Sequence, residues 1–330
     1  MRLRRREVAG VPVCEAYTPQ GWRRLTDAPE VTRLLANRGF APADDLLPYL
    51  QLGRGGWCQL AAIAPELAPA SLGPSTPLLP VRPRSFRDFM LFEKHAIDAA
   101  RGFARHFFAG LYPVARAYEA LTRRPFPKFR PHPLWYRQPT YYFGNHNTFV
   151  TDGEDVLWPP YSTFFDYEVE VGAILAHPLH NATADEAAMA IGGFVVLNDF
   201  SARDVQLDEM RSGFGPQKAK HFCSSMSAEV ITADEVSSRL QSLEGSVSIN
   251  DTTVARVSSH GPQFSLEEAI AFTSRSERLI PGELFGSGTL PGGSGIENGF
   301  PVALGDRLTL RIEGVGRLSN TITKAGSACT

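Results

Sequence analysis

The chain has 330 residues, with 33 Lys and Arg against 35 Asp and Glu, and a formal net charge of −2. A chain so close to neutral offers no bulk attraction to nucleic acid or to an anionic membrane, so neither is expected as a partner. Its apolar runs fall short of the roughly 20 residues of a membrane span, and the basic residues 1–6 lack the apolar stretch of a signal peptide.

The cysteines and lysines are few enough to judge singly. Cysteines at positions 14, 58, 223 and 329 form no CxxC motif and are widely spaced. This pattern argues against a zinc or disulfide framework and favours a reducing compartment, so a cytoplasmic protein is expected. Only five of the 33 basic residues are lysines, and two of them, Lys218 and Lys220, are almost adjacent.

The first part of the chain is predicted to be a small β-containing unit. Residues 8–17 indicate a first strand, residues 29–37 a short helix, and residues 43–47 a second helix. Residues 64–83 contain six prolines, which favour extended backbone and forbid a long helix. We therefore expect an N-terminal domain with its linker over residues 1–80 and a second domain over residues 81–330.

The second part begins as helix and then becomes β-rich. Apolar residues recur at three- and four-residue steps through residues 92–124, and Gly110 and Pro113 should split this segment into two helices. The remaining predicted elements are strands at 140–150 and 161–174 joined by a hairpin-type turn at Asp152-Gly153, a strand at 192–198, a hairpin of 245–250 with 252–257, closing strands at 302–313 and 316–323, and helices with capping boxes at 183–190 and 265–273.

One predicted strand carries alternating acidic residues. Side chains alternate across a strand, so Asp166, Glu168 and Glu170 share one face and the intervening apolar residues share the other. Three carboxylates on a buried face require a cation, and hard oxygen ligands at this spacing suit Mg²⁺, Mn²⁺ or Ca²⁺. A solvent-facing acidic strand is the alternative, and this segment alone leaves both open.

A second segment adds context. An apolar strand ends abruptly at Asn198-Asp199, which places a further carboxylate at a strand end. Arg203 and Gln206 follow at helical spacing and offer donors for a substrate carboxylate or carbonyl. A solvated helix face is the alternative for both. A glycine- and proline-containing loop at 213–216 then leads to Lys220.

These segments resemble the fumarylacetoacetate hydrolase superfamily over roughly residues 80–325. Five segments match, and they follow one another in the same order as in the family. They are Arg87-Asp88-Phe89 with His95, Asp166 to Glu170, Asn198 to Gln206, Lys220 beyond its loop, and Gly286 to Thr289 with Gly295-Ile296-Glu297. The resemblance implies an α+β, β-rich fold. It would have a mixed β-roll or β-sandwich catalytic domain, preceded by a small β-containing N-terminal domain.

The resemblance also implies a metal site. A divalent cation, Mg²⁺ or else Mn²⁺ or Ca²⁺, would be held by Glu168, Glu170, Asp199 and Asp88. Asp166 matches no ligand, and a supporting hydrogen bond suits it better. Family members usually form homodimers, so a homodimer is expected.

The catalytic groups follow from the same resemblance. His95 matches the general base and Glu297 the carboxylate that orients it, while Asp98 is a competing partner on the same helix face. Lys220 matches the lysine that stabilises developing negative charge, and Lys218 would share its face if this stretch were a strand. On such a strand, His221 would point away from Lys220.

The remaining matches concern the substrate. Arg203, Gln206 and Tyr142 would orient its acid end, and Thr289 would lie near its acid group. Ser224 falls where the family has a hydroxyl close to the metal. Methionines at positions 90 and 210 replace tyrosines of the hydrolase proper, so the substrate is expected to differ from that of tyrosine breakdown.

The expected activity is metal-dependent hydrolysis of a C–C bond in a 1,3-diketo acid, a small molecule such as an acylpyruvate or a fumarylacetoacetate-like compound. The same groups would serve a β-keto acid decarboxylase, a keto–enol tautomerase or a 2-keto-4-enoate hydratase, and the sequence leaves these open. The intact carboxylates, His95 and Lys220 argue against a non-catalytic binding protein.

Overall fold

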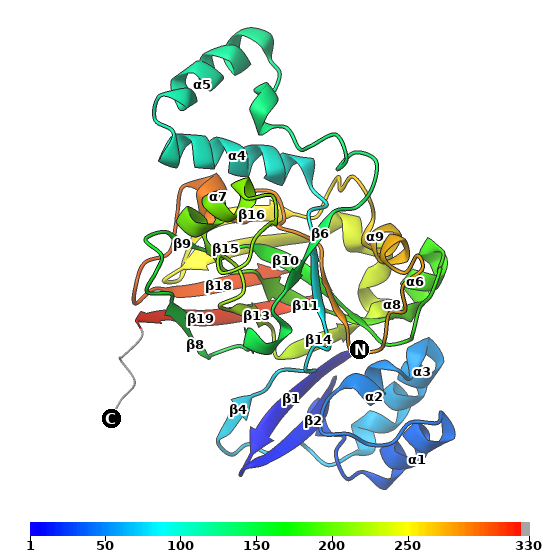
Figure 1. The fold of residues 1–330 in the computed structure, drawn as a ribbon. Coiled ribbons are helices and arrows are strands. Elements are labelled where there is room, and N and C mark those ends of the chain that lie inside the picture. The colour runs from blue at the N-terminus through cyan, green and yellow to red at the C-terminus, as the bar shows by residue number, and fades with distance from the viewer. Residues whose placement is uncertain (325–330) are drawn as a thin grey trace.

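The computed structural model describes residues 1–324, which form two β-sheets packed together with helices around them (Figure 1). The larger sheet has twelve strands. Its main path is β3 (Gly21–Arg24), β2 (Val11–Thr18), β1 (Arg2–Val8), β14 (Glu229–Thr232), β11 (Ile191–Asn198), β10 (Val169–Leu175), β17 (Leu284–Gly286), β5 (Phe86–Phe89) and β6 (Tyr141–Gly144), with β4 (Ser75–Pro77), β7 (Phe149–Val150) and β13 (Ser224–Met226) paired beside it.

The smaller sheet has five strands: β16 (Thr252–Ser258), β15 (Glu244–Ile249), β18 (Arg307–Ile312), β19 (Gly316–Lys324) and β8 (Asp155–Trp158). Contacts of β18 and β19 with β11 pack this sheet against the larger one. A short pair, β9 (Phe165–Asp166) with β12 (Ser201–Ala202), lies apart from both. The predicted α+β, β-rich class with a sandwich of two sheets is confirmed.

The centre of the larger sheet is fully buried. Every residue of β10 and β11 is buried, which explains why these segments read as nearly continuous apolar runs. Each buried Val, Ile, Leu or Phe side chain contributes about 1.5–3 kcal/mol of hydrophobic stabilisation. Glu170 lies within β10 with no exposed surface, so its charge needs a specific explanation.

The helices lie on several sides of the sheets (Figure 1). Figure 1 shows α1 (Pro29–Asn37), α2 (Leu47–Leu50) and α3 (Gly53–Ile63) beside the N-terminal strands, and α4 (Glu93–Phe107) and α5 (Leu111–Thr122) on the opposite side of the molecule. The others are α6 (Ala184–Ala190), α7 (Arg203–Arg211), α8 (Ala233–Val236), α9 (Leu266–Thr273) and α10 (Gly295–Asn298). Within residues 1–324, no helix has the length and apolarity needed to cross a bilayer.

The α4–α5 hairpin has a small core of its own. Ile97 and Ala104 of α4 pack with Ala115 of α5 and with Phe129, which lies in the 3₁₀ turn η2 (Pro127–Phe129). This cluster is separate from the large cluster that spans both sheets. The hairpin is therefore internally braced where it projects from the sheets.

Several local predictions are confirmed. Thr183 with Glu186 and Ser265 with Glu268 form complete capping boxes at the starts of α6 and α9. The helical segment is split at Gly110 into α4 and α5. Strands β15 and β16 form the predicted hairpin, whose turn residues Asn250 and Asp251 both have positive φ.

The N-terminal prediction is wrong in its details. The strand expected at 8–17 is two strands, because Ala9 and Gly10 turn the chain with φ of 51° and 78°. The basic start of the chain forms β1, since Glu15 on β2 accepts hydrogen bonds from its arginines. The helix expected at 43–47 begins only at Leu47, and α3 was not predicted.

Three later predictions also need correction. Asp152-Gly153 does not close a hairpin, because β7 pairs with β13 in one sheet and β8 pairs with β19 in the other. The turn instead links the two sheets. The strand expected at 161–174 is broken at residues 167 and 168, and the one expected at 302–313 begins at Arg307.

The sheet is continuous across residue 80. β1 pairs with β14 on one side, and β2 and β4 pair with β1. The division into residues 1–80 and 81–330 therefore stays a prediction about folding units. Cys14, Cys58 and Cys223 are free, and Cys329 lies outside the described residues.

Candidate active site

Three buried carboxylates meet at the centre of the larger sheet. One oxygen from each of Asp88, Glu168 and Glu170 lies within 4.8 Å of the others, and we call these residues the carboxylate cluster. Asp88 pairs in register with Gly286 of β17, which pairs on its other side with Gly172 of β10. A Cβ at position 286 would lie 2.4 Å from Asp88 Oδ1 and 2.6 Å from Glu170 Oε2. Glycine at this position leaves the space that the two carboxylates occupy.

Two members of the cluster, Asp88 and Glu170, have carboxylate oxygens without hydrogen-bond donors within the part of the chain that the structure describes. Among the described residues, Asp88 Oδ1 and both carboxylate oxygens of Glu170 have no partner. Burial raises the pKa of Asp88 well above its usual value, and the charge of Asp199 adds to the shift. Burial likewise raises the pKa of Glu170, with Asp88 as the next cause. Unpaired buried oxygens of this hard type fit a divalent cation such as Mg²⁺, Mn²⁺ or Ca²⁺.

The charge balance supports the same conclusion. The buried acids here are Asp88, Asp166, Glu168, Glu170 and Asp199. Two permanent cations, Lys220 and Arg203, are buried among them. If all five carboxylates were ionised, they would exceed the two cations by three negative charges. Protonation of acids with raised pKa values, or a bound cation, must offset this excess.

Lys220 stands between two of these acids. Its Nζ donates to Glu168 Oε2 and to Asp199 Oδ2, the second at 2.5 Å. Burial alone would lower the pKa of Lys220, but Asp199 and Glu168 raise it above its usual value, so the ammonium stays charged. Burial also opposes ionisation of Glu168, yet Lys220 and Arg203 hold the pKa of that carboxyl well below its usual range.

Asp199 is already surrounded by donors. Its Oδ2 accepts from Tyr142 at 2.6 Å as well as from Lys220, and its Oδ1 accepts from Ser224 Oγ at 3.3 Å. These contacts place Asp199 next to the carboxylate cluster, although it is not one of the three acids that converge. Its role as a metal ligand stays a prediction.

Arg203 links the acidic strand to α7. Its Nε donates to Asp166 Oδ2 at 2.8 Å, and its Nη1 lies 2.7 Å from Glu168 Oε1 and 3.0 Å from Gln206 Oε1. Its Nη2 is buried without a partner among the described residues.

Asp166 supports the site from behind. Besides Arg203, it accepts hydrogen bonds from the backbone N–H of Gly295 at 2.8 Å and of Ile296 at 3.0 Å. It thereby ties the acidic segment to α10. The supporting hydrogen bonds predicted for Asp166 are present, and its exclusion from the metal ligands stays a prediction.

The predicted base meets its predicted partner. His95 Nδ1 on α4 lies 2.9 Å from Glu297 Oε2 on α10. Glu297 is held in turn by the Ser294 hydroxyl at 2.7 Å and the Gly292 N–H at 3.0 Å. Burial lowers the pKa of His95, but Glu297 and then Glu168 raise it, and the net shift is upward.

Close helix packing explains this meeting. A Cβ at Gly102 of α4 would lie 2.1 Å from the carbonyl oxygen of Ile296 in α10, so only glycine permits this approach. The competing partner, Asp98, instead accepts from Lys94 and, at 2.5 Å, from Arg101. The structure therefore pairs His95 with Glu297.

These groups open onto a cavity of about 1060 Å³. The predicted site residues in its wall are Asp88, His95, Tyr142, Glu168, Glu170, Arg203, Gln206, Lys220 and Thr289. Asp199 and Glu297 do not line it, but they contact the lining residues Tyr142, Lys220 and His95. The two methionines at positions 90 and 210 also line the wall, as the substrate argument anticipated.

Sequence reasoning missed other lining residues. His221 lines the cavity, with its Nε2 2.9 Å from the carbonyl oxygen of Phe143. The prediction that it points away assumed a strand, but residues 217–222 form turns. Lys128, Phe129 and Arg130 reach the cavity from a segment whose prolines showed only an irregular crossing. No sequence signal indicated that contact.

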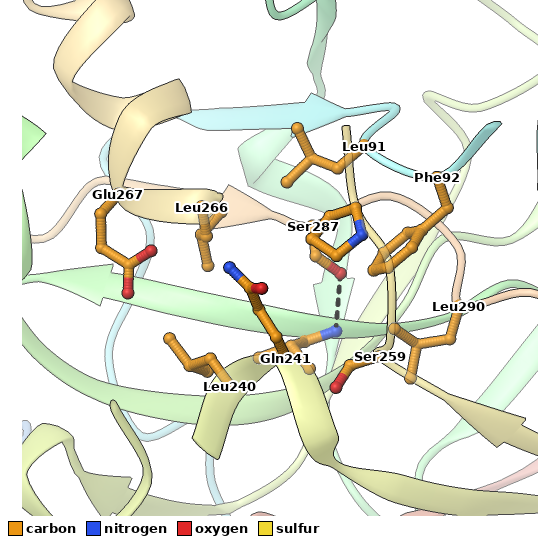
Figure 2. A pocket seen from close by; sticks show the side chains of 11 residues that line it. Leu91, Phe92, Leu240, Gln241, Ser259, Leu266, Glu267, Ser287 and Leu290 are labelled. Atoms are coloured by element: carbon orange, nitrogen blue, oxygen red, sulfur yellow. Dashed lines mark hydrogen bonds between the residues drawn. The ribbon is translucent and has the colours of Figure 1, made fainter. Parts of the chain in front are cut away.

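A second cavity lies on the other side of β10 (Figure 2). It measures about 30 Å³, room for about one or two water molecules, and Leu240, Leu266 and Leu290 form its apolar wall. Ser287 Oγ there accepts from the backbone N–H of Val171 at 3.1 Å, which bridges the segment after β17 to β10. This cavity is too small for a substrate and belongs to the core.

Part of the chain is similar in sequence to curated proteins. The chain is 30% identical over 168 residues to a 2,4-didehydro-3-deoxy-L-rhamnonate hydrolase of Sphingomonas sp. (strain SKA58), a match that covers 49% of this chain and 57% of the relative. It is 28% identical over 171 residues to a mitochondrial oxaloacetate tautomerase of Rattus norvegicus, covering 51% and 54%. The chain thus spans little more than half the length of these curated relatives.

Solved structures share the fold over nearly the whole chain. A fumarylacetoacetate hydrolase of Exiguobacterium antarcticum superposes with a TM-score of 0.70 at 18% identity, covering 98% of this chain and 99% of that one. A maleylpyruvate hydrolase of Sphingobium sp. SYK-6 superposes with a TM-score of 0.68 at 17% identity, covering 98% and 100%. The family model described as fumarylacetoacetate (FAA) hydrolase C-terminal matches residues 111–323, well over half of the sequence. The chain belongs to the fumarylacetoacetate hydrolase family.

Proposed function

We propose that this protein is a divalent-metal-dependent hydrolase that cleaves a C–C bond in a 1,3-diketo acid of the acylpyruvate type. One observation carries the proposal: the His95–Glu297 pair and the carboxylate cluster, whose members Asp88 and Glu170 have oxygens that are unpaired among the described residues, line or directly support the same cavity. A base that can accept a proton from water and a site for a Lewis-acidic cation are the two requirements of this hydrolysis.

The chain's own residues account for the proton transfers. A cation held by Asp88, Glu168 and Glu170 would polarise the oxygens of the dicarbonyl unit. His95 takes a proton from water, whose oxygen bonds to the acyl carbonyl carbon. The C–C bond then breaks, its electron pair passes to the keto acid fragment as an enolate, and the proton on His95 is transferred to that carbon. The products are a carboxylic acid and a pyruvate-type keto acid.

Other residues position the substrate and stabilise charge. The ammonium of Lys220, held in a dry site by two carboxylates, stabilises the negative charge that develops on the leaving fragment. Arg203, Gln206 and Thr289 line the same cavity and would orient the substrate's acid group. Glu297 keeps His95 oriented and stabilises its protonated form.

Keto–enol tautomerisation of a β-keto acid is the second candidate. The same base can move a proton between carbon and oxygen without consuming water, and one curated relative is an oxaloacetate tautomerase. Decarboxylation of a β-keto acid and hydration of a 2-keto-4-enoate would use the same groups. Product identity separates the four reactions: cleavage yields two acids, decarboxylation yields CO₂, hydration adds water without scission, and tautomerisation changes no composition.

The test is incubation of the purified protein with Mg²⁺ or Mn²⁺ and acetylpyruvate, benzoylpyruvate or oxaloacetate, with products identified by NMR. We expect acetate or benzoate together with pyruvate, and we expect no cleavage after chelation or in His95→Ala. Metal-dependent enolisation or decarboxylation of oxaloacetate without cleavage of either diketo acid would replace the hydrolase assignment with the corresponding alternative.

Three further assignments are part of the same proposal. We propose Mg²⁺ as the resident ion, a homodimer as the working state and the cytoplasm as the location. Metal analysis of the protein as purified, sedimentation equilibrium and cell fractionation test them in turn.

A further inference from the structure

The cavity extends well beyond the catalytic groups. Pockets of about 300–1,000 Å³ accommodate drug-sized ligands, and this one measures about 1060 Å³, much more than a short-chain diketo acid fills. Beyond His95, its wall is mostly apolar. We call this part the distal chamber and define it by Ala96, Ala99, Phe103, Phe129, Leu207 and Met210, all of which line the cavity.

One face of α4 leads from the base into the distal chamber. His95, Ala99 and Phe103 recur at four-residue steps and therefore lie along one side of the helix. With a rise of about 1.5 Å per residue, Ala99 lies about 6 Å and Phe103 about 12 Å beyond His95 along the axis. The small side chain of Ala99 thus leaves space next to His95, and the ring of Phe103 bounds this space farther along the helix.

The chamber is held by a rigid wall on one side. Phe129 is buried and packs with Ile97, Ala104 and Ala115 in the separate core of the α4–α5 hairpin. A side chain fixed in this way presents a defined surface and does not collapse into the space beside it. The opposite wall contains Leu207 and Met210, one helical turn apart on α7.

The rim of the cavity exposes large apolar side chains. Phe214 is 85% exposed and Met210 is 50% exposed, and both line the cavity. Gly213 and Gly215, on either side of Phe214, have positive φ and so set a backbone path that other residues rarely adopt. Exposed apolar groups gathered at a cavity mouth indicate a ligand that covers them.

The charges do not suit a second acid group on the substrate. Among the described residues of the cavity wall, the carboxylate cluster supplies all the acidic side chains, and the buried cations, Arg203 and Lys220, already stand beside it. The other lysine and arginine side chains of the wall, Lys128 and Arg130, are both exposed, and exposed ion pairs contribute little. The chamber therefore lacks the buried donors that would recognise a fumaryl-type carboxylate.

We propose that the substrate carries a bulky apolar group, aromatic or branched, on the acyl carbonyl farthest from its acid end, and that Ala99 is the residue whose small size admits it. The inference rests on the proposed function for the dicarbonyl end of the molecule. The apolar end is argued from the distal chamber alone.

The test compares acetylpyruvate, which ends in a methyl group, with benzoylpyruvate, which ends in a ring. Calorimetry on Mg²⁺-loaded His95→Ala measures affinity without turnover, and kcat/KM is measured on the wild type. We expect benzoylpyruvate to be preferred at least about tenfold in both, since a methylene-sized difference in an apolar pocket already changes specificity about 10- to 200-fold. Equal dissociation constants for the two compounds would overturn the proposal.

A filled chamber provides the second measurement. Ala99→Phe should remove the preference for benzoylpyruvate, whereas Ala117→Phe, at an exposed position of α5 outside the cavity, should retain it. Ala99→Leu serves the same purpose if the phenylalanine variant does not fold. If a variant with Phe or Leu at residue 99 folds and still prefers benzoylpyruvate, the inference would also be overturned. If neither compound is cleaved, but benzoylpyruvate binds more tightly and Ala99→Phe removes that difference, then the proposed hydrolase function fails while the inference about an apolar ligand group in the distal chamber is supported.

Discussion

Replacing Glu170 with glutamine should stabilise the metal-free protein. The side chain is fully buried, neither oxygen has a partner among the described residues, and it lies within 4.8 Å of an oxygen of Asp88. Two unit charges at that separation repel by about 3.5 kcal/mol at an effective dielectric constant of about 20. Raised pKa values at both acids mean that bound protons relieve part of this repulsion. We therefore expect a gain of about 1–3 kcal/mol in the free energy of unfolding.

The same substitution should abolish stabilisation by metal. Over 330 residues, an unfolding entropy of about 2.1 cal/mol/K per residue makes 1 kcal/mol equal to about 1.4 °C in Tm. The variant should then melt about 1.5–4 °C above the parent in chelator. Mg²⁺ at one hundred times its Kd stabilises a one-site protein by about 2.7 kcal/mol, or about 4 °C, and the variant should gain less than about 1 °C.

Thermal unfolding followed by circular dichroism, in chelator and in excess Mg²⁺ at pH 8, measures both effects. Glu244→Gln removes the same charge from an exposed position on β15 and should change neither value. A variant that melts below the parent in chelator would show that Glu170 makes a favourable contact and would refute the electrostatic argument. An undiminished Mg²⁺ response would remove Glu170 from the metal site.

Three more predictions follow from the same contacts. Glu297→Gln should lower the pKa of His95 and so move the acid limb of the pH profile of kcat/KM to lower pH. It should also reduce kcat by about 10²-fold or more while Mg²⁺ binding is retained. An acid limb that does not move would contradict the pairing of His95 with Glu297. Lys220→Arg should fold and bind Mg²⁺ but lose most turnover, because a planar guanidinium cannot replace a compact ammonium between two acids; near-normal activity would remove Lys220 from the mechanism. Because Asp88 and Glu170 have raised pKa values, the folded metal-free protein keeps protons that the unfolded chain loses. The contribution of these protonated acids to stability is therefore lost as pH rises from the ordinary carboxyl range to the raised pKa, and Mg²⁺ binding should release the protons. Calorimetry in two buffers of different ionisation enthalpy measures this release, and binding without it would be inconsistent with the raised pKa values.

Local patterns predicted the elements that depend on neighbouring residues. The capping boxes of α6 and α9, the break at Gly110 and the hairpin around Asn250-Asp251 all formed as expected, because each is decided by hydrogen bonds and dihedral angles within a few residues. The turn at Asp152-Gly153 formed too, but the strands on either side pair in different sheets. Pairing partners are chosen over long sequence distances, and turn residues carry no information about them.

The candidate site divides in the same way. Residue types and spacing singled out the acids of the 166–170 segment, and the family resemblance pointed to His95 and Lys220. The choice of Glu297 over Asp98 depended on the close approach of α4 to α10 at Gly102, and the gap between Asp88 and Glu170 depended on strand register at Gly286. The sequence by itself determined which chemical groups this protein has and which short elements carry them. Only the tertiary structure decided which groups meet and how large a cavity they share, because register and helix packing join residues that are far apart along the chain.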